Sequence, residues 1–137
     1  MEQKQRIGTV GLGLMGSSIA TCILAAGHPV TALTNQIATA EEARTRIKGY
    51  LQELYDEGLL QENPELVLSR LVITADIQLL RDHEFVIESI IESAEEKKKL
   101  YRQLETVLDP AAIIGSNTSA IPVSFLQEGL QYPQRLY

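Results

Sequence analysis

Residues 11–16 form a loop whose composition could bind phosphate. They read Gly-Leu-Gly-Leu-Met-Gly, directly after the apolar run Ile7–Val10 and directly before a segment with helical periodicity. In this context the first glycine permits a tight turn, the second lets a phosphate approach the backbone, and the third lets helix and strand pack closely. Free N–H groups and the dipole at the helix start attract an anion. We therefore predict that the loop binds the pyrophosphate of a dinucleotide, rather than serving only as a strand-to-helix turn.

The kind of dinucleotide depends on the residues that follow the second apolar run, Val30–Leu33. NAD-binding sites usually carry a carboxylate there, which bonds the ribose hydroxyls. This chain has Thr34-Asn35-Gln36 instead, and Thr34 takes the place of the acid by spacing. The missing charge would admit NADP, but no arginine follows at once to hold a 2′-phosphate, since Arg44 and Arg46 lie further along the chain. NAD is predicted, with NADP as the open alternative.

Short apolar runs alternate with segments of helical periodicity along the whole chain, which is typical of a parallel sheet with crossover helices. The expected strands are Ile7–Val10, Val30–Leu33, Leu71–Thr74, 85–87 and 112–116, with 135–137 as the start of a sixth. We predict an α/β fold of the Rossmann type, a doubly wound parallel sheet in the order 3-2-1-4-5. Residues 1–137 are expected to form a single dinucleotide-binding domain, truncated at the sixth strand.

The expected helices cover residues 15–26, 38–55, 77–80 and 123–127, and a further one begins at Ser93. Ser93 and Glu96 match a capping box, in which the two residues satisfy each other's backbone donors. Leu100, Leu104 and Leu108 form the apolar face of this helix, and Asp109-Pro110 ends it. Asn63-Pro64 is expected to be a surface turn.

Two segments in the second half of the chain resemble one enzyme family. Residues 86–93 read Val-Ile-Glu-Ser-Ile-Ile-Glu-Ser, and with Glu96-Lys97-Lys98 they are similar to the fourth-strand and helix signature of 3-hydroxyacyl-CoA dehydrogenases. Residues 113–122 are similar to the Ser-Asn-Thr-Ser loop that follows the fifth strand of that family, and residues 133–137 resemble its next segment. The resemblance covers nearly the whole chain. It implies an NAD-dependent oxidoreductase of fatty acid metabolism, which transfers hydride between C3 of a 3-hydroxyacyl-CoA and the nicotinamide.

The resemblance also implies roles for individual residues. Glu92 and Lys97 match residues that contact the cofactor, and Asn117 shapes the loop after the fifth strand. Ser119 matches a serine that contacts both the nicotinamide and the substrate oxygen, and it is the catalytic candidate. Read without the family, Glu92 is a residue favoured by the dipole at a helix start, Lys97 a solvent-facing cation and Ser119 a turn residue. The residues expected to bind the cofactor are Gly11, Leu12, Gly13, Leu14, Met15, Gly16, Thr34, Glu92, Lys97, Asn117 and Ser119.

The family's catalytic histidine and its helical domain, which binds substrate and dimerises, are expected to lie beyond Tyr137. This chain alone is therefore expected to be inactive. His28 is expected to be structural, His83 a surface residue and Cys22 a core residue. Where the family often has a serine and a lysine that contact coenzyme A, this chain has Tyr50 or Leu51 and Leu59 or Leu60, so CoA as the substrate's handle stays open. The alternatives are a dinucleotide-binding module without catalysis and a domain of a related NAD(P)-dependent hydroxy-acid dehydrogenase.

Composition limits the other classes. The chain has 45% apolar and 22% charged residues, which excludes a disordered protein. A net charge of −6 argues against nucleic acid as a partner, and one cysteine excludes an internal disulfide and a zinc site of thiolates alone. The first residues lack the apolar core of a signal peptide, and no apolar run approaches the roughly 20 residues that span a bilayer. We expect a cytoplasmic protein with a small-molecule substrate, no bound metal and no membrane partner.

Overall fold

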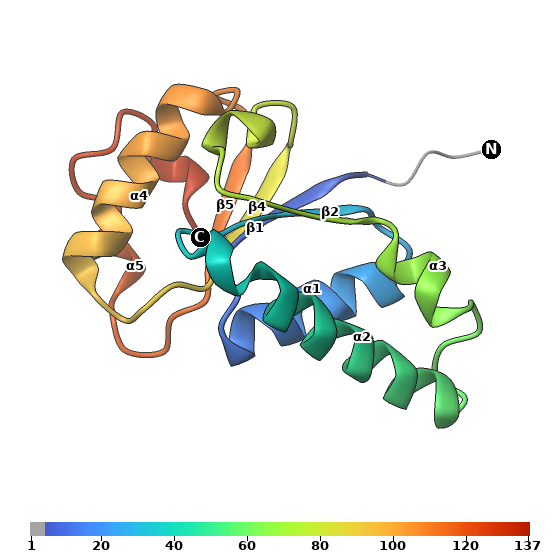
Figure 1. Ribbon diagram of the computed structural model, residues 1–137. Helices are drawn as coiled ribbons and strands as arrows, with labels where there is room; N and C mark the ends of the chain where they lie inside the picture. The colour runs from blue at the N-terminus through green and yellow to red at the C-terminus, as the bar shows by residue number, and fades with distance from the viewer. Residues whose placement is uncertain (1–4) are drawn as a thin grey trace.

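Five parallel strands form one sheet, in the order β3-β2-β1-β4-β5. The computed structural model describes residues 5–137 and shows helices on both faces of this sheet (Figure 1). The strands are β1 (Ile7–Val10), β2 (Val30–Leu33), β3 (Leu71–Thr74), β4 (Phe85–Glu88) and β5 (Ile113–Ser116). The predicted Rossmann-type fold and its strand order are confirmed.

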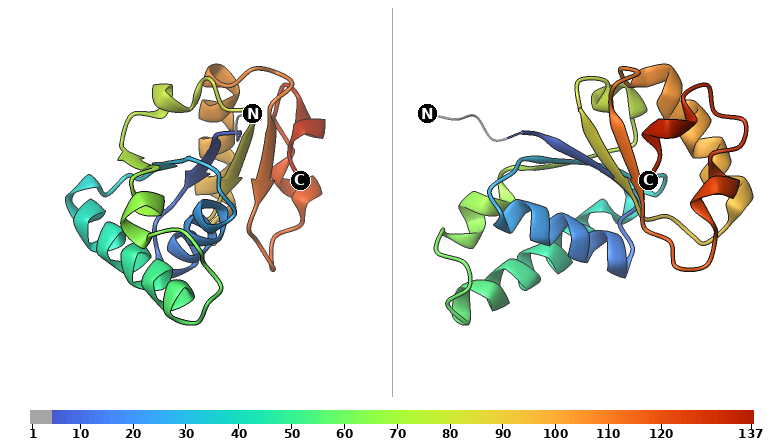
Figure 2. Two further views of the ribbon diagram at one scale, coloured as in Figure 1. Left: turned by 90° about the vertical axis from the view of Figure 1, so that its right-hand side faces the viewer. Right: turned by 180° about the vertical axis from the view of Figure 1, so that it is seen from behind.

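The helices fall into two groups, one on each face of the sheet (Figure 2). The first group is α1 (Leu14–Ala25), α2 (Ala40–Asp56) and α3 (Pro64–Leu68), and the second is α4 (Ala94–Val107) and α5 (Val123–Leu126). Three 3₁₀ turns complete the described part of the chain, at Ile37–Thr39, Ile77–Leu80 and Pro133–Arg135. Within residues 5–137, no helix combines the length and the apolar character needed to cross a membrane.

Each group of helices covers its own apolar core. On the first face, Leu24, Ile47 and Leu51 are fully buried against the strands. On the second face, Leu104 and Leu126 are fully buried in a separate cluster. In a sheet covered on both faces the side chains of a central strand are buried on both sides, and all four residues of β2 are buried accordingly.

The strands end at one level, which brings their carboxyl ends together at one edge. The paired terminal residues are Thr74, Leu33, Val10, Glu88 and Ser116, in the order of the strands across the sheet. Ligands of open α/β sheets bind beyond this edge, where the strand order reverses between β1 and β4. The loops that follow β1, β4 and β5 are therefore the ones that can form a site.

The structure differs from two local predictions, the turn at residues 63–64 and the capping box of α4. Asn63 and Pro64 begin α3 rather than forming only a turn: the Asn63 side chain accepts the Glu65 N–H at 2.8 Å, and Pro64 fills the first helical position. Asparagine and proline are common both in turns and at helix starts, so the sequence alone does not distinguish a turn from a helix start here. The capping box of α4 forms only in half: Ser93 accepts the Glu96 N–H at 3.3 Å, whereas the Ser93 N–H bonds Ile91.

The sixth strand is present only as a single bridge. Leu136 pairs in parallel with Ile114 of β5, and the Tyr137 N–H donates to the Ile114 carbonyl at 2.9 Å. A 3₁₀ turn immediately before it takes Arg135 out of strand geometry. Within residues 5–137 the expected sixth strand is thus reduced to this bridge.

Two residues lie where the sequence did not place them. Cys22 was expected in the core, but α1 turns it to the exposed side. His83 was expected at the surface, but only 2% of it is exposed, and its Nε2 lies 3.0 Å from the Thr31 hydroxyl. Its charged neighbours Asp82 and Glu84 mark a surface turn, and only tertiary packing shows that the ring folds inward. Burial, and secondarily the positive charge of Arg6, lower the pKa of the His83 imidazole.

This lowered pKa predicts a loss of stability at mildly acidic pH. The native state keeps His83 neutral, while the unfolded chain binds a proton near the ordinary histidine pKa of about 6.5. The unfolded state then binds more protons, so the free energy of unfolding should fall as pH drops from about 7.5 to 5.5. Urea titrations across this range should show the fall for the parent chain and for His28→Gln, and a smaller one for His83→Gln. An equal fall in all three chains would contradict the assignment.

Candidate dinucleotide-binding site

A cleft of about 1200 Å³ opens at the carboxyl ends of the strands. Its walls are the loop after β1, the first turns of α2, and the segment between β4 and α4. The sequence-predicted residues that line it are Gly11, Leu12, Gly13, Leu14, Met15, Gly16, Thr34, Glu92 and Asn117. Lys97 and Ser119, which were also predicted to bind the cofactor, do not line the cleft.

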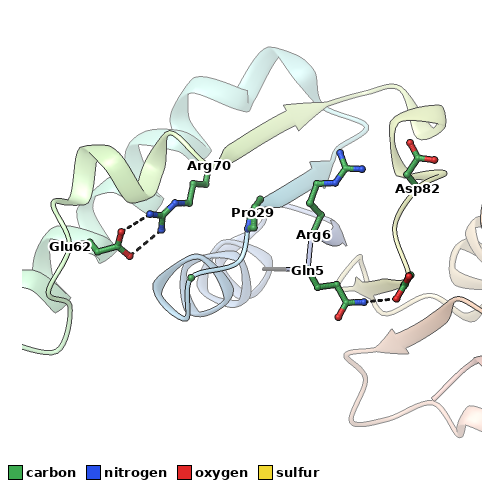
Figure 3. A pocket seen from close by; sticks show the side chains of 8 residues that line it. Gln5, Arg6, Pro29, Glu62, Arg70 and Asp82 are labelled. Carbon is green, nitrogen blue, oxygen red and sulfur yellow. Dashed lines mark hydrogen bonds and ion pairs between the residues drawn. The ribbon is translucent and has the colours of Figure 1, made fainter. Parts of the chain in front are cut away.

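A second cleft, of about 840 Å³, lies at the opposite edge of the sheet (Figure 3). Most of its polar groups bind one another: Arg70 forms an ion pair with Glu62 at 2.5 Å, and Gln5 donates to Glu84 at 3.0 Å. This edge carries the amino ends of the strands, away from the glycine loop. It does not make a site for a dinucleotide.

The three glycines of the loop differ in what surrounds them. A Cβ on Gly11 would lie 2.2 Å from the Ser89 carbonyl oxygen, and the backbone φ there is +102°. A Cβ on Gly16 would lie 2.2 Å from the Gly11 carbonyl oxygen. A Cβ on Gly13 would meet nothing within 4 Å. Close packing thus requires glycine at positions 11 and 16, whereas the backbone at Gly13 faces open space.

This bare backbone fits a pyrophosphate. Gly13 is the N-cap of α1 and offers no side-chain acceptor, so the N–H groups of the first turn are left for a ligand. α1 has no acidic residue in its first turn that would repel an anion. The adjoining cleft also has the length of wall that a dinucleotide needs, since it runs from the end of β2 to Asn117.

The end of the cleft next to β2, where the adenosine of a dinucleotide would bind, has the neutral Thr34 in the place of the expected acid. Thr34 is 8% exposed, and its Oγ1 accepts the Gln36 N–H at 3.0 Å, so its own hydrogen is free to be donated. Arg46, which the sequence analysis set aside because it lies further along the chain, also lines the cleft. Arg46 reaches from α2 to the glycine loop, and its Nη1 lies 3.3 Å from the Leu12 carbonyl oxygen and 3.2 Å from the Ser17 hydroxyl.

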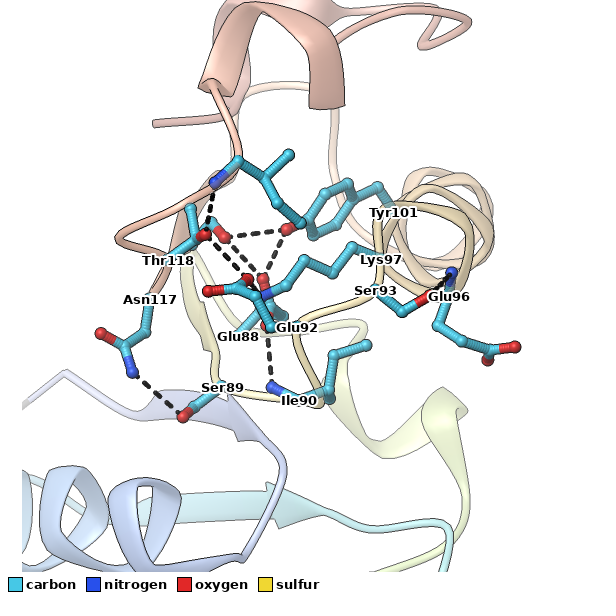
Figure 4. A network of polar contacts seen from close by, with 12 residues as sticks. Glu88, Ser89, Ile90, Glu92, Ser93, Glu96, Lys97, Tyr101, Asn117 and Thr118 are labelled. Carbon is cyan, nitrogen blue, oxygen red and sulfur yellow. Dashed lines mark hydrogen bonds and ion pairs between the residues drawn. The ribbon is translucent and has the colours of Figure 1, made fainter.

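A buried carboxylate organises the other wall (Figure 4). Glu88, the last residue of β4, is fully buried. One of its oxygens accepts the Lys97 ammonium at 2.6 Å and the Ile90 N–H at 2.8 Å. The other accepts the Ser116 hydroxyl at 2.6 Å and the hydroxyl of Tyr101. Burial, with the hydrogen bond to Glu88, raises the pKa of the Tyr101 hydroxyl, which stays protonated and able to donate.

Lys97 is therefore not the solvent-facing cation that helix position suggested. Its side chain is fully buried, and it bridges Glu88 to Glu92, whose carboxylate lies 3.3 Å from the ammonium. The sequence-predicted contact of Lys97 with the cofactor stays a prediction. The structure gives the ammonium two carboxylate partners beneath the wall of the cleft.

Glu92 connects this cluster to the loop after β5. Its carboxylate accepts the Thr118 hydroxyl at 2.8 Å. That hydroxyl, the Lys97 ammonium and the Ser119 backbone N–H lower the pKa of the Glu92 carboxyl, which stays ionised. Thr118 in turn accepts the Ile121 N–H at 3.2 Å. The loop around Ser119 is thus fixed at its base.

Asn117 and Ser119 stand at the end of the cleft nearest β5. The Asn117 N–H donates to the Glu88 carbonyl at 2.8 Å, and its Nδ2 donates to the Ser89 hydroxyl at 3.3 Å. Ser119 is exposed on the same loop, outside the cleft lining. Its contacts with nicotinamide and substrate stay a prediction.

Comparisons with known proteins agree with this geometry. Residues 6–137 match the sequence model of a family described as 3-hydroxyacyl-CoA dehydrogenase, NAD binding domain. A 3-hydroxybutyryl-CoA dehydrogenase of Mycobacterium tuberculosis is 35% identical over 134 residues, which is 96% of this chain and 47% of that protein. A probable 3-hydroxybutyryl-CoA dehydrogenase of Deinococcus radiodurans is 33% identical over 88% of this chain and 44% of that protein. This chain thus spans about half the length of these relatives.

A solved structure supports the same grouping. The crystal structure of FadB2 from Mycobacterium tuberculosis superposes with a TM-score of 0.90 and 34% identity, over 98% of this chain and 48% of that one. The similarity therefore extends over the whole described sheet and both clefts' surroundings, not only over the glycine loop.

The buried ion pair predicts an asymmetric effect of substitution. Lys97→Met would leave the Glu88 carboxylate buried without its cation, which should cost about 3–5 kcal/mol of the free energy of unfolding. Lys99→Met, two residues along at an exposed position of the same helix, should cost less than about 0.5 kcal/mol. Removing both charges with Glu88→Gln and Lys97→Met should cost less than the sum of the single changes, because the two sites are coupled. Urea denaturation measures all four; equal costs for Lys97→Met and Lys99→Met would rule out the pair as a stabilising element.

Proposed function

The chain belongs to the family of 3-hydroxyacyl-CoA dehydrogenase NAD-binding domains, and we propose that it binds NAD in the cleft beyond β1, β2, β4 and β5. We further propose that it serves as the cofactor-binding part of an enzyme that transfers hydride between C3 of a 3-hydroxyacyl-CoA and the nicotinamide. The observation that carries the proposal is the open space above Gly13, between two glycines that packing requires.

The proposed pose follows the chemistry of the cleft. The pyrophosphate lies against the first-turn N–H groups of α1, where the helix dipole favours its charge. The adenosine ribose lies at Thr34, whose hydroxyl can donate to it. The nicotinamide, which supplies the hydride acceptor when bound, lies toward Asn117. In this pose the Ser119 hydroxyl, two residues beyond Asn117 on the same loop, is proposed to contact the substrate oxygen, as the family resemblance implies.

In this proposal Glu92 and Lys97 position the loop around Ser119. The Glu92 carboxylate holds Thr118 and the Ser119 N–H, and Lys97 holds Glu92 against Glu88. A fixed loop matters because an error of about 1 Å in the position of a reacting group can cost a hundredfold in rate. Glu92 also lines the cleft, so it can touch the cofactor from its exposed side.

The substrate is proposed from the relatives. Proteins named 3-hydroxybutyryl-CoA dehydrogenase are among those similar to this chain, which supports a 3-hydroxyacyl-CoA as substrate. The residues that would hold the coenzyme A, the helical domain that would cover the acyl chain, and the general base are proposed to lie outside residues 1–137.

Gly13→Val tests the cofactor site. Gly13 has φ −70° and ψ −166°, which a valine can adopt, and its Cβ would meet no other atom of the protein within 4 Å. The variant should therefore fold as the parent does but place methyl groups where the pyrophosphate must approach. Losing those hydrogen bonds should weaken NAD binding by about tenfold or more in calorimetry.

Gly49→Val is the matched control. A Cβ on Gly49 in α2 also meets nothing within 4 Å, and Gly49 does not line the cleft. It should bind NAD as the parent does. Equal NAD affinity in the parent and in Gly13→Val would show that the site has been placed wrongly.

The 137-residue chain alone should not oxidise 3-hydroxyacyl-CoA. Among the described residues that line the cleft there is no histidine. Of the carboxylates beside the loop after β5, Glu88 is buried under four donors, and a lowered pKa makes Glu92 a weak base. Serine needs a neighbouring base for its own activation. General-base catalysis contributes roughly a hundredfold to ten-thousandfold, so no NADH formation above the buffer rate is expected.

The rate of NADH formation by Gly13→Val, purified in the same way, measures the activity of any contaminating dehydrogenase. Turnover by the parent chain well above that of this preparation would contradict the prediction, and it would require another base within these residues.

A further inference from the structure

The adenosine end of the cleft lacks the negative charge that would exclude a phosphate. Thr34, Asn35 and Gln36 follow β2 and all line the cleft. A carboxylate at this position would bond the ribose 2′-hydroxyl and repel a 2′-phosphate. Here the side chains are neutral, and Thr34 keeps a hydroxyl hydrogen to donate.

A cation lines the same cleft. Arg46 lies in the second turn of α2, and it lines the cleft together with Thr39, Glu42 and Ala43. Its guanidinium is held against the glycine loop through Nη1, which contacts the Leu12 carbonyl and the Ser17 hydroxyl. Arginine has five N–H donors, and Nη1 supplies two of them. Nε and Nη2 have no hydrogen-bond partner within residues 5–137.

The negative charge of Glu42 should affect a bound phosphate less than the positive charge of Arg46 does. Glu42 lies one turn before Arg46 and also lines the cleft. Glu42 is exposed, so water and salt screen its carboxylate. Arg46 is half-buried and fixed in place by two contacts, so its charge is less screened and its geometry is set in advance.

We propose that this cleft accepts the 2′-phosphate of NADP as well as the plain ribose of NAD, and that Arg46 is the residue that binds this phosphate. The proposal rests on dinucleotide binding at the glycine loop. Planar guanidinium groups bind phosphate through paired hydrogen bonds, and the free Nε and Nη2 edge of Arg46 offers such a pair. Arg46 would then determine the cofactor specificity of the chain, in place of the absent acid after β2.

Calorimetric titration of NAD⁺ and NADP⁺ into the 137-residue chain tests this directly. We expect the two dissociation constants to lie within about tenfold of each other. Arg46→Gln should weaken NADP⁺ binding by about tenfold to a hundredfold, the range for hydrogen bonds to charged groups, and should change NAD⁺ binding by less than about threefold. Arg46→Lys keeps the charge without the paired donors and should fall between the parent and Arg46→Gln.

Arg44→Gln is the matched control, since it removes the same charge from the same helix at a residue outside the cleft lining. It should leave the binding of both dinucleotides unchanged. Retained NAD⁺ binding also reports that the loop of Arg46→Gln is folded.

Three outcomes would overturn the proposal, and they differ from one another. NAD⁺ binding with NADP⁺ bound more than about tenfold more weakly rejects the 2′-phosphate site but leaves the proposed NAD function intact. Equal weakening of both dinucleotides by Arg46→Gln assigns Arg46 to the pyrophosphate instead. Binding of neither dinucleotide by the parent rejects both the site and the function on which it rests.

Discussion

The Glu88 carboxylate needs hydrogen-bond partners inside the protein, because burying an unpaired charge costs several kcal/mol. It ends β4 with no exposure to solvent, and its four donors come from three separate parts of the chain. Ile90 belongs to the turn, Lys97 and Tyr101 to α4, and Ser116 to the end of β5. Satisfying one carboxylate therefore fixes α4 against the sheet, and with it the loops after β4 and β5.

The opposite wall of the cleft is fixed by steric fit instead of charge. Gly11 packs so closely on the Ser89 carbonyl that no side chain is allowed there. Ser89 is the residue next to Glu88, and it also accepts the Asn117 amide. The two walls thus meet at one short segment after β4, which ties the glycine loop, the buried ion pair and the loop around Ser119 into one rigid arrangement. A rigid cleft is what binding a long, flexible cofactor requires, since less ordering is left to occur on binding.

Local patterns predicted the fold and one wall of the site. β-Branched apolar runs gave the strands nearly to the residue, because each run is short and ends in polar or glycine residues. The glycine loop was found because its three glycines lie within six residues, directly between an apolar run and a segment of helical periodicity. Lys97 and His83 were misplaced, and Arg46 was set aside, because their partners lie far along the chain. These partners are Glu88, Thr31 and Leu12, which are 9 to 52 residues away. A charged residue on a helix is normally read as exposed, and only the packed structure shows a buried partner.

A crystal structure of the 137-residue chain with NAD⁺ tests the central claim most directly, because it locates the cofactor and the buried cluster together. We predict that the pyrophosphate lies over Gly13 against the first turn of α1, while the Lys97 ammonium stays between Glu88 and Glu92. Both walls should keep their positions on binding. A pyrophosphate bound elsewhere, or a Lys97 side chain that leaves Glu88 to contact the cofactor, would contradict the account.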